Sequence, residues 1–155
     1  MTKPHLSTII LSVLLVLAGI SLASPAQANS QDVVPEAELV KAMERVPGGD
    51  VIDSHTAYWP DLQMTMTVPD ERLRDAIGTC PHGSVCAFSG PTLSGTRLAW
   101  TTCGTHSTAA LGAVGSIANA KTSGTLQARY GTTVMATASA QSWNNVTGTV
   151  NNVHC

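Results

Sequence analysis

The stretch Cys80-Pro-His-Gly-Ser-Val-Cys86-Ala-Phe88 combines two cysteines, a turn and the beginning of a strand. Proline and glycine are turn residues, so the segment between the two cysteines is expected to bend tightly. Val85 to Phe88 is an apolar run with the length of a buried strand. This spacing favours a local disulfide between Cys80 and Cys86, placed where a β-sheet begins.

The chain has four cysteines, and all of them lie at or beyond Cys80. Four cysteines allow three disulfide connectivities, and the spacing favours pairing Cys80 with Cys86, which leaves Cys103 for Cys155. The alternative is a zinc site, for which the candidate ligands are Cys80, His82, Cys86, His106 and His154. Five residues separate the first two cysteines, more than the usual spacing of a structural zinc site, so two disulfides are favoured.

The second half of the chain is typical of a mainly β protein. It is rich in Thr, Ser, Gly, Ala and Val, and the only helical feature we expect is a turn near Ser107 to Leu111. Short strands separated by glycines indicate a sandwich or barrel. The predicted strands are Val85–Phe88, Thr96–Trp100, Ser116–Asn119, Thr125–Tyr130, Thr133–Thr137 and Gly148–Val153.

Charge divides the chain into two parts. All ten carboxylates lie between Asp32 and Asp75, and with four basic residues the segment from Asn29 to Asp75 has a net charge of −6. From Ala76 to Cys155 the fixed charges are Arg97, Lys121 and Arg129. Without a carboxylate this part cannot supply a carboxylate pair, the acid of a Ser-His-Asp triad or a carboxylate-rich cation site. Its scattered basic residues do not predict nucleic-acid binding. Because the carboxylates needed for these kinds of catalysis are missing, we expect a binding protein and no enzyme.

Residues 1–28 have the pattern of a secretory signal peptide. Lys3 and His5 precede an apolar core from Ile9 to Ile20, and Ala26-Gln27-Ala28 matches a small-x-small cleavage site. The alternative is a membrane anchor, but the apolar run is shorter than the roughly 20 residues that span a bilayer. We expect a secreted, extracellular protein that begins near Asn29 and does not remain in the membrane.

The acidic segment, residues 29–78, is predicted to hold a short helix and a β-hairpin. The helix, Pro35 to Arg45, would present an apolar stripe of Ala37, Val40 and Met43. Strand patterns follow at Val51–Ile52, His55–Trp59 and Gln63–Val68, with Met64, Met66 and Val68 on one face. The segment is either a prosegment that proteolysis removes or a layer that stays with the remainder of the protein.

Two motifs between Cys80 and Gly131 match one protein family, with a weaker crystallin-like tail to Cys155. The first is Cys80-Pro-His-Gly-Ser-Val-Cys86-Ala-Phe-Ser-Gly90-Pro-Thr-Leu-Ser-Gly95-Thr-Arg97, which resembles the opening of the Streptomyces metalloproteinase inhibitor family. The second comprises Gly115-Ser116-Ile117-Ala118-Asn119 and Leu126-Gln127-Ala128-Arg129-Tyr130-Gly131. The resemblance implies a single βγ-crystallin-like domain of two Greek keys at residues 79–155, and the helix and hairpin predicted for the acidic segment precede it. Phe88 and Gly95 fit the crystallin hairpin signature, while Leu93 replaces its second aromatic ring.

The family resemblance also implies a function. It predicts a monomeric, cofactor-free peptidase inhibitor that binds an extracellular protease, with a thermolysin-like metalloprotease favoured, in the manner of a substrate. In the family a cysteine-bounded reactive loop follows the Tyr-Gly strand, whereas this chain has no cysteine between Gly131 and Cys155. The nearest protease-contact candidates are Thr132, Thr133, Val134 and Met135. The competing hypothesis is a secreted crystallin-like binding or toxin module that inhibits no protease.

The segment from Trp143 to Val150 is similar to the crystallin calcium-binding segment. Its candidate ligands are Asn144, Asn145 and Thr149, but Gly148 stands where the segment usually has a hydroxyl. A site without a carboxylate is a poor cage for a hard cation. We therefore expect Asn144 and Asn145 to form a turn and the protein to hold no metal.

Overall fold

The structure is a computed structural model that describes residues 33–70 and 80–155. Both described ranges belong to one compact unit, which extends from Gln31 to Cys155. The predicted signal peptide, its cleavage site and the charged connector at residues 71–79 lie outside the described residues. Within the described ranges, no helix is long and apolar enough to cross a membrane.

The fold is mainly β, as predicted, with two antiparallel sheets and two disulfides. One helix, α1 (Ala37–Arg45), and a short 3-10 helix (Pro60–Leu62) accompany the strands in the described ranges. The strands are β1 (Asp50–Val51), β2 (Thr56–Trp59), β3 (Met64–Thr67), β4 (Val85–Phe88), β5 (Arg97–Trp100), β6 (Thr105–Ser107), β7 (Ser116–Asn119), β8 (Thr125–Tyr130), β9 (Thr133–Ser139), β10 (Ser142–Asn145) and β11 (Asn152–His154).

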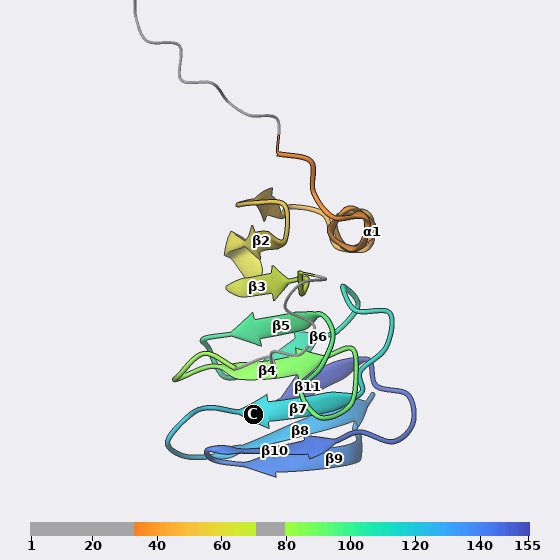
Figure 1. The fold of residues 1–155 in the computed structure, drawn as a ribbon. Coiled ribbons are helices and arrows are strands. Elements are labelled where there is room, and N and C mark those ends of the chain that lie inside the picture. The colour runs from red at the N-terminus through yellow and green to blue at the C-terminus, as the bar shows by residue number, and fades with distance from the viewer. Residues whose placement is uncertain (1–32, 71–79) are drawn as a thin grey trace, which may run out of the picture. The chain divides into compact units, whose positions relative to one another are not determined.

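The strands from β4 onward form two quartets that exchange their third members. The seven-stranded sheet has the order β1-β2-β3-β5-β4-β7-β10, and the four-stranded sheet has the order β6-β11-β8-β9 (Figure 1). Strands β4, β5 and β7 are neighbours, while β6 lies in the other sheet beside β11. In the same way β8, β9 and β11 are neighbours, while β10 lies beside β7. Each sheet therefore contains one strand from the other quartet.

Two local predictions are wrong and one strand was not predicted, and all three concern the exchanged strands or the chain that follows them. Strand β6, Thr105–Ser107, was missed, whereas the turn expected near Ser107 to Leu111 does follow it, where the Leu111 amide donates to the Thr108 carbonyl. Asn144 and Asn145 belong to strand β10 because they pair with β7, so they do not form a turn. The predicted strand Gly148–Val153 shrinks to Asn152–His154, because Gly148 has a left-handed backbone with φ of 95°.

Helix α1 forms as predicted, but it buries a different face. Leu39 and Ala42 are fully buried, whereas Val40, which was expected in the apolar stripe, is 43% exposed. The apolar stripe that packs on the core is Leu39, Ala42 and Val46, whose spacing of three and four residues is helical. Packing on the sheet selects this face, and the Trp59 indole N–H donates to the Val46 carbonyl at 2.7 Å.

The acidic segment shares a sheet and a core with the second half of the chain. Strand β3 pairs with β5 over four residues, from Met64 opposite Trp100 to Thr67 opposite Arg97. The larger apolar cluster contains buried side chains from α1, β2 and β3 together with side chains from β4, β5, β7, β8 and β11. A smaller cluster, Cys86, Phe88, Ala99 and Ala118, lies on the other face of the seven-stranded sheet.

Candidate functional site

The protease-contact candidates lie together at the end of the β8–β9 hairpin. Tyr130 pairs with Thr133, so the connection is the two-residue turn Gly131-Thr132. Gly131 has φ of 60°, and Thr132 is not among the residues with positive φ. Glycine at the first central position is the pattern of a type II′ turn, whose twist suits the two flanking strands.

The side chains at this hairpin end are exposed. Thr132 and Thr133 are exposed, Val134 is 46% exposed and the ring of Tyr130 is 57% exposed. Met135 is half-buried, and its terminal methyl group lies against Gly148. An apolar side chain at Val134 is therefore available to a partner, whereas Met135 contributes to packing within the protein.

A β-bulge lies within the same stretch. Ala128 pairs with Ala136 and Arg129 pairs with Val134, so Met135 is the extra residue on β9. A bulge increases the local twist and changes the direction of the side chains beside it. The side chains of Thr133 and Val134 therefore point in directions that differ from the regular alternation of the remainder of β9. Strand β9 is an edge strand of its sheet.

Two asparagines brace the turn from the neighbouring chain segment. The Gly131 amide donates to the Asn151 side-chain oxygen at 2.9 Å, and the Asn152 side-chain amide donates to the Gly131 carbonyl at 3.0 Å. Asn152 also donates to Asn151, at 2.7 Å. The Asn151 amide donates to the Arg129 carbonyl at 3.0 Å. Both backbone polar groups of Gly131 are thus satisfied, which holds the turn in one conformation.

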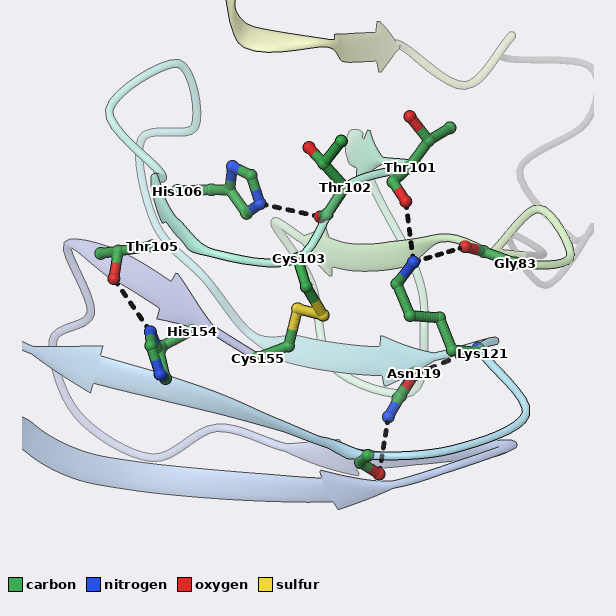
Figure 2. Close-up of a disulfide and its surroundings, with 11 residues drawn as sticks. Gly83, Thr101, Thr102, Cys103, Thr105, His106, Asn119, Lys121, His154 and Cys155 are labelled. Atoms are coloured by element: carbon green, nitrogen blue, oxygen red, sulfur yellow. Dashed lines mark hydrogen bonds between the residues drawn. A yellow bond between two sulfur atoms is a disulfide. The ribbon is translucent and has the colours of Figure 1, made fainter.

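The segment that carries these asparagines is itself anchored by the Cys103–Cys155 disulfide, shown in Figure 2. The bridge joins the end of the chain to the loop before β6, and the two Cα atoms are 5.3 Å apart. The Thr105 hydroxyl and the Nδ1 atom of His154 share a hydrogen bond of 2.9 Å beside it. A chain of contacts therefore links the disulfide to β11, then to Asn151 and Asn152, and finally to the turn.

The fixed positive charges of the second half are engaged in structural contacts. The Lys121 ammonium donates to the carbonyls of Gly83 and Thr101, at 2.9 Å and 2.7 Å (Figure 2). The Arg129 guanidinium donates to Gln127 beside it, and Arg97 donates to Thr67. Burial lowers the pKa of the Arg97 guanidinium from its ordinary value. The three charges therefore stabilise loops and strand pairs.

The candidate zinc ligands are not brought together. Cys80 is bonded to Cys86 and Cys103 to Cys155, the pairing that the spacing favours. His106 stacks on Trp100, with ring centroids 5.2 Å apart, and its Nε2 donates to the Thr102 carbonyl. In the described ranges, no group of three His, Cys, Asp or Glu side chains converges as a metal site would require.

The calcium candidates make contacts within the protein. The Asn145 side-chain oxygen accepts a hydrogen bond from the Thr92 amide at 2.8 Å. The Asn144 side-chain amide donates to the Thr137 carbonyl at 3.2 Å. Thr149 is exposed in the irregular segment between β10 and β11. The two amides therefore tie β10 to the 89–96 loop and to β9.

The sequence predicted the two strands that flank the turn but not the asparagines that support it. Asn151 and Asn152 lie roughly twenty residues from the turn they brace, and their separations from Gly131 are 20 and 21 positions. A pair of adjacent asparagines is an ordinary loop pattern in a single sequence. The one available signal for this support was that the two asparagines directly precede Val153, an apolar residue that is fully buried.

Comparison with protein-family models, with curated proteins and with solved structures finds no match for this chain.

Proposed function

We propose that the chain is a secreted peptidase inhibitor with a crystallin-like domain at residues 79–155. It binds an extracellular, thermolysin-like metalloprotease through the β8–β9 hairpin, as a substrate would bind, and it acts as a monomer without a cofactor. The braced, exposed hairpin end from Tyr130 to Met135 carries this proposal. The two disulfides support an oxidising extracellular location, where such bridges persist.

Strand order supports the crystallin-like part of the proposal. In a Greek key the fourth strand returns to lie beside the first. Here β7 lies beside β4 and β11 lies beside β8, and the third strand of each quartet joins the opposite sheet. Two Greek-key motifs are what the family resemblance implies.

The connection between β4 and β5 supports it further. Gly95 has φ of 77°, and a side chain there would collide with the Ser89 hydroxyl group. The Thr96 amide donates to that hydroxyl at 2.8 Å, so the loop is folded back on itself. Leu93 packs against the cluster that contains Phe88, where the crystallin signature has its second ring. The three signature positions thus act together, although one ring is missing.

The geometry of the hairpin supports a substrate-like mode of binding. A protease binds its substrate as an extended strand, and Thr133 and Val134 are extended, exposed and at a sheet edge. Val134 is the apolar side chain available for the pocket that accepts the residue after the scissile bond. Because the turn is already held by Asn151 and Asn152, binding orders few additional groups, which lowers the entropy cost of association. The same bracing holds the two chain ends in place if the protease cleaves the bond before Val134, so we expect the complex to dissociate slowly.

Inhibition of thermolysin by the mature chain tests the proposal. We expect stoichiometric inhibition of peptide hydrolysis, and we expect Val134→Asp to raise the inhibition constant about tenfold or more, equivalent to about 1.4 kcal/mol. The matched control is Val34→Asp, because Val34 is 78% exposed and lies outside every helix and strand. That variant should inhibit as the wild type does. If the wild-type chain leaves thermolysin fully active at a large molar excess, the inhibitor function is wrong for this enzyme class.

A further inference from the structure

Trp143 differs from the other two tryptophans of the chain. Trp59 and Trp100 are each 1% exposed, whereas Trp143, on the edge strand β10, is 46% exposed. Burying an aromatic ring is among the largest apolar contributions that a side chain can make. A half-exposed tryptophan on a paired strand therefore leaves apolar surface that a ligand could bury.

The ring stands at one end of a row of small residues. Trp143 pairs with Ala118 on β7, and Ala118 pairs with Cys86 on β4, so the three share one face of the sheet. Beside this row is an open pocket of about 320 Å³. Its apolar lining residues include Trp143, Leu93 and Ala118, and its polar lining residues include His82, Gln141 and Ser142.

The walls of the pocket are held firmly. The Cys80–Cys86 disulfide closes the loop that carries His82. The Gly83 amide donates to the Ala120 carbonyl at 2.9 Å, which ties this loop to the chain after β7. The Gln141 amide donates to the Lys121 carbonyl at 3.2 Å, which fixes the turn before β10. A pocket held in this way binds a ligand with little loss of its own conformational freedom.

The chemistry of the lining selects a class of ligand. A flat indole offers a platform for an apolar face, and the amide, hydroxyl and imidazole among the lining residues offer hydrogen-bonding groups. Among the described residues that line the pocket there is no Asp, Glu, Lys or Arg. This combination matches a neutral sugar ring, because a pyranose has C–H patches on its faces and hydroxyls around its edge. We propose that the Trp143 pocket binds a neutral sugar unit of an extracellular oligosaccharide.

This binding site is separate from the proposed inhibitory hairpin. The pocket uses the outer face of the seven-stranded sheet, while the hairpin end belongs to the four-stranded sheet. A protein that holds both could attach to a polysaccharide surface while it blocks a protease there. The sugar site does not depend on the inhibitor function, and the two can be tested independently.

Titration of the wild-type chain with cellotriose and with N-acetylchitotriose, followed by NMR of the indole N–H groups, tests the proposal. We expect the Trp143 signal to shift, with a dissociation constant of about 1 mM or tighter. The Trp59 signal should stay in place, because its N–H is bonded to Val46 in the core.

Variants assign the binding to the pocket. Trp143→Ala should weaken sugar binding at least about tenfold and leave thermolysin inhibition unchanged. Tyr130→Ala, which changes the exposed ring of the hairpin, should leave sugar binding unchanged. Trp143→Phe provides a second test, with partial loss expected, should the alanine variant fold poorly. The proposal is overturned if neither trisaccharide shifts the Trp143 signal at about 10 mM. It is equally overturned if Trp143→Ala binds as the wild type does, or if a leucine- or tryptophan-containing peptide binds the pocket and the sugars do not.

Discussion

Gly131 sets the geometry of the β8–β9 turn through its backbone. Its φ of 60° lies in the left-handed region, and a Cβ atom there would meet nothing within 4 Å. Glycine is therefore required by conformation and not by lack of space. The neighbouring Asn151 and Asn152 bond both polar groups of its backbone, so the turn depends on residues that approach from β11.

Replacing Asn151 should loosen the turn without unfolding the protein. Asn151→Leu removes the acceptor for the Gly131 amide, and a hydrogen bond of this kind contributes about 1 kcal/mol. We expect hydrogen exchange of the Gly131 amide to become roughly threefold to tenfold faster. Asn151→Asp retains the acceptor oxygen and should preserve the protection. The Gly115 amide, bonded to the Phe88 carbonyl at 2.8 Å, is an internal reference that should not change. Equal exchange rates in the leucine variant and the wild type would show that Asn151 does not brace the turn.

At the scale of single elements, β3 has the largest consequence. It pairs with β5, the first neighbour of β4, and it carries Met64 and Met66 into the core with exposures of 1% and 0%. Alternating burial over Met64–Thr67 is the pattern that the sequence predicted. The acidic segment, through this strand, covers the edge of β5 that would otherwise be open. We therefore infer that it is retained in the working protein.

The substitution Met66→Ala measures how much the packing of β3 contributes to the free energy of unfolding. Truncating a fully buried methionine removes transfer free energy and leaves a cavity, so we expect a loss of about 2–5 kcal/mol in the free energy of unfolding. Met135→Ala, at a half-buried position, should cost clearly less. Urea denaturation monitored by tryptophan fluorescence compares the two variants. A loss below about 1 kcal/mol for Met66→Ala would mean that the acidic segment is a separable layer.

At the scale of the whole molecule, the two disulfides constrain very different lengths of chain. Cys80 and Cys86 are six positions apart, while Cys103 and Cys155 are 52 apart. In the loop-entropy model, closing the longer loop restricts the unfolded chain by about 4 kcal/mol, and closing the shorter one by about 2.3 kcal/mol. The longer bridge also fixes β11, which lies between β6 and β8.

Removing both sulfurs of each bridge in turn tests this ranking. We expect the double variant Cys103→Ser/Cys155→Ser to lose about 2–5 kcal/mol of stability, and Cys80→Ser/Cys86→Ser to lose less. Thermal denaturation of the two double variants measures the order. The first should also weaken thermolysin inhibition, because the bridge supports the segment that braces the hairpin. A wild-type melting temperature for the first variant, together with collapse of the second, would contradict both the ranking and the role of β11.

Much of the architecture follows from local patterns. The strands Val85–Phe88, Ser116–Asn119 and Thr125–Tyr130 have the predicted bounds, because each is an apolar or alternating run between turn residues. The pairing of Cys80 with Cys86 follows from a short spacing around a turn, and it leaves a single choice for the other two cysteines. The separation of acidic and carboxylate-free parts is a property of composition alone.

The remaining features depend on contacts between distant segments. Strands β6 and β10 were missed because they are short and largely exposed, so no apolar alternation marks them, and only pairing with β11 and β7 makes them strands. The buried face of α1, the bulge at Met135 and the hollow beside Trp143 were likewise decided by what packs against them. Periodicity in a sequence determines which residues can share a face of an element. The partner that covers that face is chosen by the free energy of the whole packed structure, to which residues far apart in the chain contribute together.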